Sequence, residues 1–447
     1  MNALRYLSTR GGAPAASLGE AIAAGLAPDG GLYVPERLPS IDPATFAPAG
    51  SLATTANTLL APFFAGDPLA GALPAICAEA FNFDAPLRPL ARPDASLLEL
   101  FHGPTAAFKD FGARFLAASL RRLREPQAPP LTILVATSGD TGAAVGAAFH
   151  GQPNLRVAIL YPDGRVSPRQ AHQLGSFGGN VQALRVAGSF DDCQRMVKAA
   201  LRDADLQARV PLSSANSISL GRLLPQMAYY AHAALQTCHP HGAPLDLIVP
   251  TGNLGNALAA VWARAMGLPI GRIVLACNAN ATLPEFFAGG AYAARPAQPT
   301  LANAMDVGAP SNFERLRWTY PDDAALRAAL NARSVDDATI RATVQRHAES
   351  YGELLCPHTA TAMHLLDREP VRSHGQWAVV ATAHPAKFEQ VLEPLLRQPL
   401  AVPPALAVML ARPAQAEPLA ADDDALRDWL LAGAQKSAQG DAFRAAT

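Results

Sequence analysis

The sequence predicts an α/β fold with parallel sheets, because short apolar runs alternate with segments of helical pattern. Six apolar runs have the length and composition of buried strands: 97–101, 131–136, 155–161, 245–250, 272–277 and 377–383. Between and after them lie segments whose apolar residues recur three or four positions apart, as is typical of amphipathic helices: 112–124, 141–149, 190–202, 257–266 and 386–396. Two doubly wound α/β units account for this order.

The chain divides into three parts by pattern. Residues 1–92 contain loops around DGGLYVPERLP and alanine-rich helical stretches, so we expect a separate N-terminal domain there. Residues 93–400 hold the predicted strands and helices of the two-lobed region. Residues 401–447 form an extension in which the acidic cluster 422–424 is placed to cap a last helix.

Composition indicates a globular protein that acts on a small molecule. Half of the 447 residues are hydrophobic and 16% are charged, with 36 Lys and Arg against 37 Asp and Glu. This balance gives no global field that would attract nucleic acid or an anionic membrane. We therefore expect a small-molecule substrate, no nucleic-acid partner and no membrane partner.

Cysteine usage and the N-terminal segment favour a cytoplasmic location. The five cysteines are scattered, odd in number and without a C-x-x-C pair, which argues against a disulfide framework and against a thiolate metal site. No His and Cys residues have zinc-site spacing, so we expect no metal. The first residues lack the features of a signal peptide, and no uncharged apolar run approaches the ~18 residues that span a membrane.

Lys109 is the first candidate for chemistry. It follows a predicted strand that ends at Phe101 and a Gly-Pro turn, and it precedes the predicted helix at Gly112. A lysine by itself is usually a solvated surface residue. The flanking rings of Phe108 and Phe111, however, would desolvate the amine and lower its pKa below the ordinary value of about 10.4, and a neutral amine can form a Schiff base.

The segment TGNLGN, residues 251–256, is the second candidate. It joins a buried strand to a helix expected to start near Ala257, with Asn256 available as an N-cap. Gly252 and Gly255 allow the backbone to turn so that successive N–H groups and the helix N-terminus point at one anion. The alternative is a glycine-rich connector without a ligand, and the segment lacks the spacing of nucleotide-binding fingerprints.

Two further strand ends carry polar groups. Ser138, Gly139, Asp140 and Thr141 open a helix that could receive a carboxylate, although Asp140 or Thr141 could equally serve as an N-cap alone. Thr382 ends a predicted buried strand, where its hydroxyl could meet a ring nitrogen or satisfy only local backbone groups.

Taken in order, these segments resemble threonine synthases of the bacterial and fungal subgroup over nearly the whole chain. The matching segments are YLSTRG (6–11), DGGLYVPE (29–36), HGPTAAFKDFG (102–112), ATSGDTG (136–142), SSANSISLGRLLPQ (213–226), TGNLGN (251–256), MDVGAPSNFER (305–315), CPHTATA (356–362) and ATAHPAKF (381–388). The resemblance implies fold type II of the pyridoxal-phosphate enzymes, with the cofactor between two doubly wound α/β lobes and a small N-terminal domain.

The resemblance also implies roles for individual residues. Lys109 matches the lysine that carries pyridoxal 5'-phosphate and acts as the catalytic base, and Thr382 matches the hydroxyl that faces the pyridine nitrogen. The implied cup for the cofactor phosphate consists of Gly252, Asn253, Leu254, Gly255 and Asn256. The implied substrate-binding residues are Ser138, Gly139, Asp140, Thr141, Asn216, Ser217 and Arg222, where an arginine on an exposed helix is the alternative interpretation of Arg222.

The implied reaction converts O-phospho-L-homoserine and water to L-threonine and phosphate by γ-elimination and β-addition, in a monomer or homodimer. Three residues depart from the pattern of the family: Leu254 replaces Phe, Ser219 replaces Asn and Cys356 replaces Asp. None of them removes a reacting group, but the last two leave substrate contacts open. A phospholyase or ammonia-lyase on the same fold, and a non-catalytic protein that kept the fold, are the alternatives.

Overall fold

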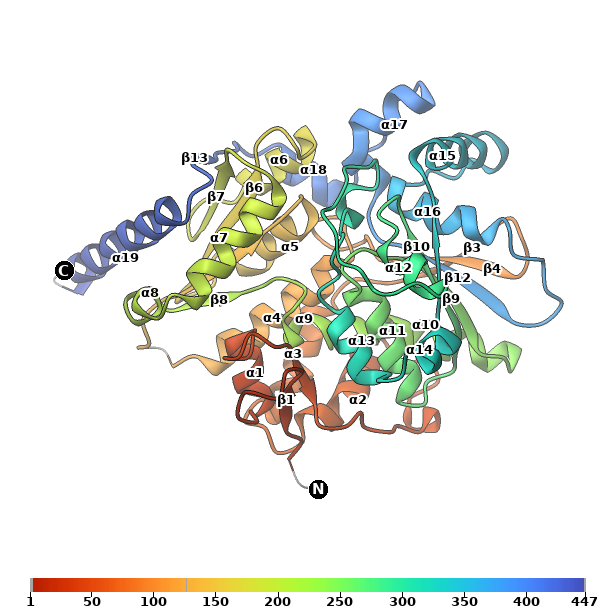
Figure 1. The fold of residues 1–447 in the computed structure, drawn as a ribbon, viewed down its shortest axis with the longest axis horizontal. Helices are drawn as coiled ribbons and strands as arrows, with labels where there is room; N and C mark the ends of the chain where they lie inside the picture. Colours follow the sequence, from red (N-terminus) through yellow and green to blue (C-terminus); the bar gives the residue numbers. More distant parts are fainter. Residues whose placement is uncertain (1–2, 126, 446–447) are drawn as a thin grey trace.

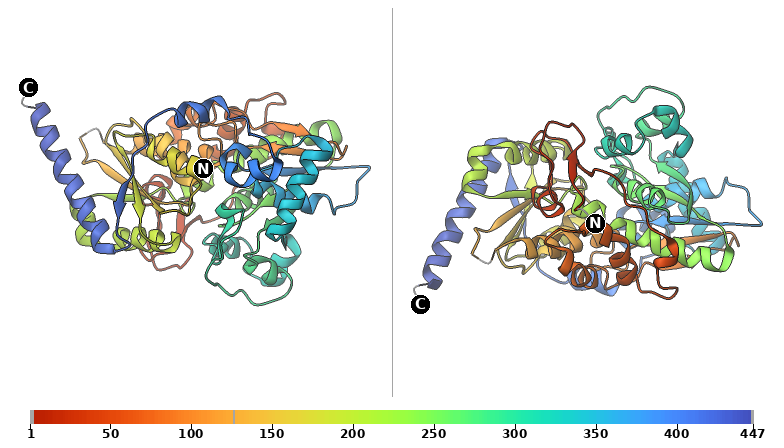
Figure 2. Two further views of the ribbon diagram at one scale, coloured as in Figure 1. Left: turned by 90° about the horizontal axis from the view of Figure 1, so that it is seen from above. Right: turned by 90° about the horizontal axis from the view of Figure 1, so that it is seen from below.

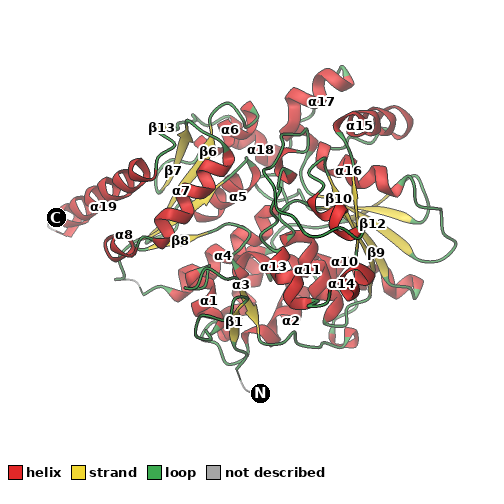
Figure 3. Cartoon of the chain, in the orientation of Figure 1, coloured by secondary structure: helices red, strands yellow, loops and turns green. Residues whose placement is uncertain are grey.

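Two open sheets, each covered by helices on both faces, form the frame of the molecule (Figures 1 and 3). The computed structural model describes residues 3–125 and 127–445, with the side chains of these ranges except 239–241 and 435–445. The two sheets confirm the expected α/β class with parallel sheets and helices.

The larger sheet has six strands in the order β11-β10-β9-β12-β4-β3. All neighbours are parallel except β3 and β4. The strands are β3 (Leu87–Pro89), β4 (Ala95–Glu99), β9 (Leu245–Pro250), β10 (Ile270–Cys277), β11 (Asn331–Ser334) and β12 (Gln376–Ala381). Helix α16 (Pro357–Leu366) packs on one face, and α10 (Gln226–His241) and α11 (Gly255–Ala265) pack on the other.

The smaller sheet has five parallel strands in the order β13-β7-β6-β5-β8. They are β5 (Leu131–Ala136), β6 (Leu155–Pro162), β7 (Val181–Val186), β8 (Leu212–Ser214) and β13 (Glu417–Leu419). Helices α5 (Asp140–Phe149) and α6 (Pro168–Gly175) lie on one face, and α7 (Phe190–Arg202) lies on the other. The sequence pattern did not indicate β13, which returns from the C-terminal extension to pair with β7.

The N-terminal segment packs beneath both lobes. Its strands β1 (Tyr6–Ser8) and β2 (Tyr33–Pro35) pair antiparallel, and its helices are α1 (Leu18–Ala24), α2 (Leu52–Phe64) and α3 (Leu73–Ala80). Helices α1 and α3 contact α4 (Lys109–Leu123), whereas α2 contacts α10. Helix α4 thereby joins the N-terminal segment to the rest of the hydrophobic core.

The remaining elements are short connectors and covering helices. The α-helices are α8 (Ala204–Arg209), α9 (Leu220–Leu223), α12 (Thr282–Phe287), α13 (Phe313–Thr319), α14 (Asp323–Ala329), α15 (Asp337–Tyr351), α17 (Glu389–Leu396) and α18 (Pro404–Leu410). The 3-10 turns are η1 (Pro43–Thr45), η2 (Ala70–Ala72), η3 (Asn303–Met305) and η4 (Pro385–Phe388).

The last helix, α19 (Asp423–Ala445), lies at the outer end of the smaller sheet and projects from it (Figure 2). Asp423 and Asp424 occupy its first turn, where negative charge is favourable near a helix N-terminus. Leu426 and Leu430 are buried against the residues of α7. Apolar burial therefore anchors the start of this helix.

Element boundaries differ from expectation by a few residues at the site. Helix α4 begins at Lys109 itself, three residues before the expected start, and β4 and β12 end at Glu99 and Ala381, two residues before the expected ends. All five cysteines are free thiols. Among the described residues, no helix has the length and apolar character needed to cross a membrane.

Candidate active site

A cavity of about 570 Å³ opens between the two sheets, next to loops that follow the carboxyl ends of β5, β9 and β12. Ligands commonly bind at this edge in open α/β sheets. The cavity brings together nearly all of the expected site residues: Lys109, Ser138, Asp140, Thr141, Asn216, Ser217, Arg222, residues 252–256 and Thr382. Gly139 does not line it.

A short antiparallel bridge places Lys109 near Thr382. Ala107 bridges to Ala383, and the N–H of Phe108 donates to the carbonyl oxygen of Thr382 at 2.8 Å. The chain before the lysine is therefore tied to the chain after β12. The hydroxyl of Thr382 has no hydrogen-bond partner among the described residues and is free to meet a ligand.

The amine of Lys109 has no hydrogen bond or ion pair with the described residues. Its Nζ lies 5.8 Å from the centroid of the Phe108 ring. Burial lowers the pKa of this amine to about 8; the charge of Asp140 acts in the opposite direction, whereas Arg222 and Lys387 lower the pKa further. A substantial fraction of the amine is consequently neutral near pH 8.

Asp110, the residue after the lysine, organises the preceding loop. Its carboxylate accepts hydrogen bonds from the N–H and the hydroxyl of Thr105, at 2.9 and 2.7 Å, and burial raises its pKa to about 6. A side chain at Gly103 would lie 2.5 Å from this carboxylate. Phe111, expected to flank the amine, packs its ring 4.5 Å from that of Phe83, centroid to centroid, so it contributes to the core.

The segment 251–256 turns between β9 and α11, and all six of its residues line the cavity. The first N–H groups of a helix have no partner within the helix and can bind an anion. A Cβ at Gly252 would lie 2.8 Å from the Cα of Met305, so only glycine fits there. Leu254 has φ of +63° and is itself the N-cap of α11, which makes the expectation of Asn256 as N-cap wrong.

Asn256 instead presents its side chain to the cup. Its Oδ1 accepts hydrogen bonds from the hydroxyls of Tyr229 and Tyr230, at 2.5 and 2.8 Å. Its Nδ2 is buried without a hydrogen-bond partner among the described residues. A phosphate oxygen would satisfy this donor, so the residues of the cup fit a phosphate group.

The loop after β5 is built around a buried ion pair. The Asp140 carboxylate lies 2.7 Å from Nζ of Lys387 and accepts a hydrogen bond from Gln170 at 3.0 Å. Burial disfavours the charged carboxylate, but the charges of Lys387 and Lys109 outweigh this effect and hold the pKa of Asp140 well below the usual range. Neither Asp140 nor Thr141 acts as an N-cap, because that position is held by Gly139.

Thr137 fixes the backbone of this loop. Its Oγ1 accepts hydrogen bonds from the N–H groups of Gly139 and Gly142, both at 2.9 Å. Gly139 has φ of +135°, and a Cβ there would lie 2.6 Å from the amide nitrogen of Gln170. Gly139 therefore shapes the loop from behind, while Ser138 and Thr141 line the cavity.

A second group of polar side chains lines the cavity from the segment before α10: Asn216, Ser217 and Arg222. Arg222 is only 3% exposed, which makes the alternative of an exposed arginine wrong. Its Nη1 donates to the carbonyl oxygen of Ala215, and its Nε has no partner among the described residues. Burial lowers the pKa of Arg222 to about 10. The buried Oδ1 of Asn216 also lacks a partner in the described part of the chain, whereas Ser217 accepts a hydrogen bond from Asn253.

The unusual residues at two of the three departures both lie at helix N-termini. Cys356 is the N-cap of α16, and its Sγ accepts a hydrogen bond from the N–H of Thr359 at 3.4 Å, as an aspartate could. Ser219 is the N-cap of α9 without a side-chain cap bond, and its buried hydroxyl has no partner among the described residues.

Comparison with known proteins places the chain in a family. Residues 84–385 match the sequence profile described as pyridoxal-phosphate dependent enzyme, and residues 5–81 match the profile described as threonine synthase N terminus. The threonine synthase of Serratia marcescens is 39% identical over 417 residues, which cover 93% of this chain and 96% of that protein. The chain belongs to the threonine synthase family of pyridoxal-phosphate-dependent enzymes.

Solved structures of the threonine synthase family have the same fold. The crystal structure from Escherichia coli superposes with a TM-score of 0.88 at 36% identity, covering 96% of this chain and 100% of that one. The pyridoxal-phosphate-bound structure from Brucella melitensis gives 0.87 at 33% identity, with 96% and 99% covered. These findings confirm the expected family, fold type, enzyme class and cofactor, and they support the expected function as a threonine synthase.

Three features of this threonine synthase family member were missed from the sequence. Lys387 lies in the matching segment 381–388, but its only signal was a lysine after a strand, which is usually solvated. Tyr229 and Tyr230 carried no signal beyond apolar helix pattern. His358 lines the cavity, where its Nε2 accepts a hydrogen bond from the N–H of Ala304 and burial lowers its pKa to about 4, so it stays neutral.

Proposed function

We propose that the chain converts O-phospho-L-homoserine and water to L-threonine and phosphate, by γ-elimination followed by β-addition of water. The observation that supports this best is the Lys109 amine, which has no hydrogen-bond or ion-pair partner among the described residues and shares one cavity with two separate sets of anion donors. A cofactor phosphate accounts for one set. The second set calls for a substrate that carries anionic groups of its own.

The cofactor phosphate would occupy the cup formed by residues 252–256. When bound, pyridoxal phosphate withdraws electrons from the substrate carbons and so acidifies their C–H bonds. Lys109 would hold the cofactor and, once released by the substrate amine, remove the proton from Cα and then one from Cβ. Thr382 would face the pyridine nitrogen with a neutral hydroxyl, which does not stabilise a proton on that nitrogen as a carboxylate would.

The substrate would be held by the second set of donors. Arg222 can bind a phosphate or carboxylate with two N–H groups, and in a buried site such a bond is strong. Asn216 and Ser217 would contact the same ligand, and Ser138 and Thr141 would receive the other anionic group at the start of α5. Asp140 would act through Lys387, because its carboxylate is already paired.

The cellular setting proposed is threonine biosynthesis within the aspartate family of amino acids, in the cytoplasm. Five free thiols and a balanced charge support a reducing compartment and a small-molecule substrate without nucleic-acid or membrane partners. Either a monomer or a homodimer is compatible with this proposal.

The test is to incubate the cofactor-loaded protein with O-phospho-L-homoserine and to quantify threonine, 2-oxobutyrate and phosphate together. We expect threonine equal to phosphate, and a loss of more than about 100-fold in rate for Lys109→Ala, because the variant lacks the base. The absorbance of bound cofactor in the variant shows whether the cavity survives.

Other product patterns would change the assignment. Oxoacid in place of threonine would move the protein to the phospholyase alternative. Absence of phosphate release from a cofactor-loaded protein would reject both enzymatic assignments for this substrate and leave the non-catalytic alternative.

A further inference from the structure

The outer part of the cavity is formed by one face of α7 and by the N-terminal segment. The cavity is lined on this side by residues at helical spacing, which places them on one face of α7: Gln194, Val197, Lys198 and Leu201. Across from them lies the loop that contains Gly30. None of these residues belongs to the segments that hold the lysine, the cup or Arg222.

Three exposed cations line this outer part of the cavity, which we call its mouth: Arg10, Lys198 and Arg202. A Cβ placed on Gly30 would lie 2.9 Å from Nη1 of Arg10 and 3.9 Å from Nη2 of Arg202. Two guanidinium groups from distant parts of the chain therefore approach the same glycine.

The nearby acids pair with only one of these three cations. Glu314 forms an ion pair with Arg10, whose Nε lies 3.3 Å from its carboxylate, and it also accepts a hydrogen bond from the hydroxyl of Thr9. Asp191 of α7 also lines the cavity. The carboxylate of Asp29 accepts from Ser8 and from the backbone N–H groups of two glycines. Lys198 and Arg202 make no hydrogen bond or ion pair with any described residue. Arg295 also lines the cavity, but it is paired with Glu285.

Two like unit charges about 4 Å apart in water repel by about 1 kcal/mol, and the repulsion falls as their separation grows. A dianion between them removes the repulsion, and its oxygens accept charge-assisted hydrogen bonds from each cation. A phosphate group has the charge and the number of acceptors that this arrangement can use. It is also the group that the proposed substrate carries and that the proposed reaction releases.

We propose that Arg10, Lys198 and Arg202 form a staging site for phosphate at the mouth of the cavity. The site holds the phosphate of the incoming phosphomonoester before its amine reaches Lys109, and it holds inorganic phosphate on the way out. This role rests on the proposed function only in the choice of a phosphomonoester as the substrate. No bond is made or broken at this site.

The side chains of the staging site are exposed to solvent, so we expect them to bind phosphate more weakly than the buried donors do. Charges at the surface bind weakly and are screened by salt over about 10 Å at 0.1 M ionic strength. They nevertheless raise the local concentration of an oppositely charged ligand and its rate of association. Arg222, at 3% exposure, is suited to the tighter binding needed during the reaction.

The staging site is tested on the holoenzyme with inorganic phosphate as the probe. Calorimetric titration should show two phosphate sites in the parent protein and loss of the weaker one in the double variant Lys198→Ala, Arg202→Ala. In turnover, the double variant should lose about tenfold in kcat/KM at low salt while kcat changes less than about twofold. The dependence of kcat/KM on salt should become correspondingly flatter.

A matched control is Arg209→Ala, which removes an exposed arginine of the next helix, α8, that does not line the cavity. It should leave the titration and the salt dependence unchanged. Arg202→Lys keeps the charge and should retain most of kcat/KM. The kinetics distinguish binding of the substrate's phosphate from binding of inorganic phosphate. If the site no longer holds incoming substrate, kcat/KM falls; if it no longer holds released phosphate, product inhibition by phosphate weakens.

Unchanged phosphate titration in the double variant would overturn the staging site, and so would a loss confined to kcat. Failure of the proposed function is distinguishable from this outcome. If O-phospho-L-homoserine gives no threonine but the double variant still loses a phosphate site, the staging site stands and the substrate assignment falls.

Discussion

The amide of Asn256 is fixed in one orientation before any ligand binds. Both hydroxyls of Tyr229 and Tyr230 donate to its Oδ1, and both tyrosines are fully buried in α10. A buried donor without a partner costs about 1–3 kcal/mol, and Nδ2 of Asn256 is such a donor among the described residues. A bound phosphate oxygen would recover this cost. If Asn256 holds the cofactor phosphate as proposed, the two tyrosines, which lie outside the matching segments, would contribute to cofactor affinity through it.

Asn256→Asp should weaken the binding of pyridoxal phosphate by about 10- to 100-fold, equivalent to about 1.4–2.7 kcal/mol. The variant keeps the shape and the oxygen that faces the tyrosines, but it replaces the free donor with a negative oxygen. The measurement is a fluorescence titration of the apoprotein with pyridoxal phosphate. Tyr230→Phe, which leaves one tyrosine hydroxyl in place, should weaken binding less; an equal dissociation constant in Asn256→Asp and the parent would contradict this role.

At the scale of secondary-structure elements, the buried His347 links helix α15 to the end of α16. Nδ1 of His347 lies 3.1 Å from Glu353, and Nε2 lies 3.1 Å from Asp367, which ends α16 and also pairs with Arg346. Burial disfavours the charged ring, but the hydrogen bonds to Asp367 and Glu353 outweigh it and raise the pKa of His347 to about 9. The ordinary pKa of histidine is about 6.5. The charged ring therefore stabilises the fold at low pH.

The stabilisation by His347 should be fully present below about pH 6.5 and should be lost as the pH rises through about 9. The size expected is about 3 kcal/mol, because one pKa unit corresponds to about 1.4 kcal/mol. Melting temperatures of the parent and of His347→Gln, compared at pH 6 and pH 9.5, check this. The gap between the two proteins should narrow at the higher pH, and a constant gap would show that the ring acts by packing alone.

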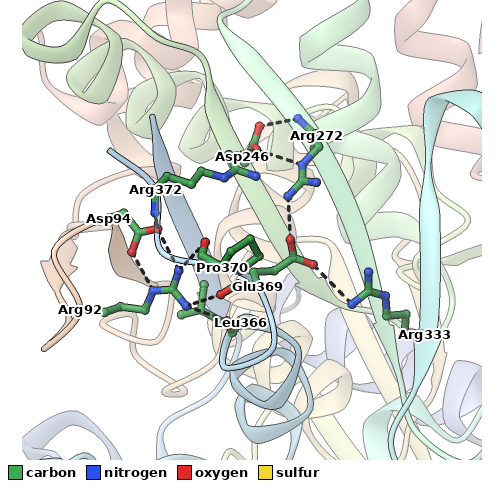
Figure 4. Close-up of polar contacts among 9 residues, drawn as sticks. All are labelled: Arg92, Asp94, Asp246, Arg272, Arg333, Leu366, Glu369, Pro370 and Arg372. Atoms are coloured by element: carbon green, nitrogen blue, oxygen red, sulfur yellow. Dashed lines mark hydrogen bonds and ion pairs between the residues drawn. The ribbon is translucent and has the colours of Figure 1, made fainter. Parts of the chain in front are cut away.

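At the scale of the whole molecule, the two ends of the strands in the larger sheet carry different features. The cavity lies beyond the carboxyl ends of the strands, whereas a network of arginines and acids lies at the amino ends (Figure 4). Asp246, 6% exposed near the start of β9, accepts hydrogen bonds from the side chains of Arg272 and Arg372 at 3.2 and 2.5 Å. Glu369 extends the network from Arg272 to Arg333 (Figure 4).

The same two arginines enclose an aromatic ring. The guanidinium carbons of Arg272 and Arg372 lie 4.6 and 4.5 Å from the ring centroid of Trp377 in β12. The network therefore ties β9, β10 and β12 together through charge and through cation–π contacts. Residues 251–256 after β9 and Thr382 after β12 line the cavity. Asn278 after β10 donates a hydrogen bond to Asp306, which also lines it.

Asp246→Asn should lower the free energy of unfolding by about 2 kcal/mol, the order of a hydrogen bond to a charged group. The cofactor dissociation constant and kcat/KM should stay within about twofold of the parent, because the network lies at the edge away from the cavity. Thermal unfolding and steady-state kinetics on the same preparation give both values. A large loss of cofactor affinity in a stable variant would show that the two edges are coupled.

The sequence by itself determined the fold class and the segments that form the candidate site. The periods of apolar residues in strands and helices reflect local backbone preference, and glycines at strand ends mark turns. These local signals placed the ends of the strands and helices next to Lys109, the 251–256 turn and Thr382 within two or three residues of the observed ends. The order of the matching segments identified the family. These features are local or linear, so one chain read from end to end contains them.

Only the tertiary structure decided which side chains meet and what their charges become. The helices bring Tyr229 and Tyr230 to Asn256, the loops bring Lys387 to Asp140, and the N-terminal segment brings Arg10 to Arg202. Helix α11 begins at Gly255 with Leu254 as its N-cap, and β13 finds its partner in β7 from the far end of the chain. Burial and electrostatic partners arise from the packing of distant segments, and no local pattern of residues encodes that packing.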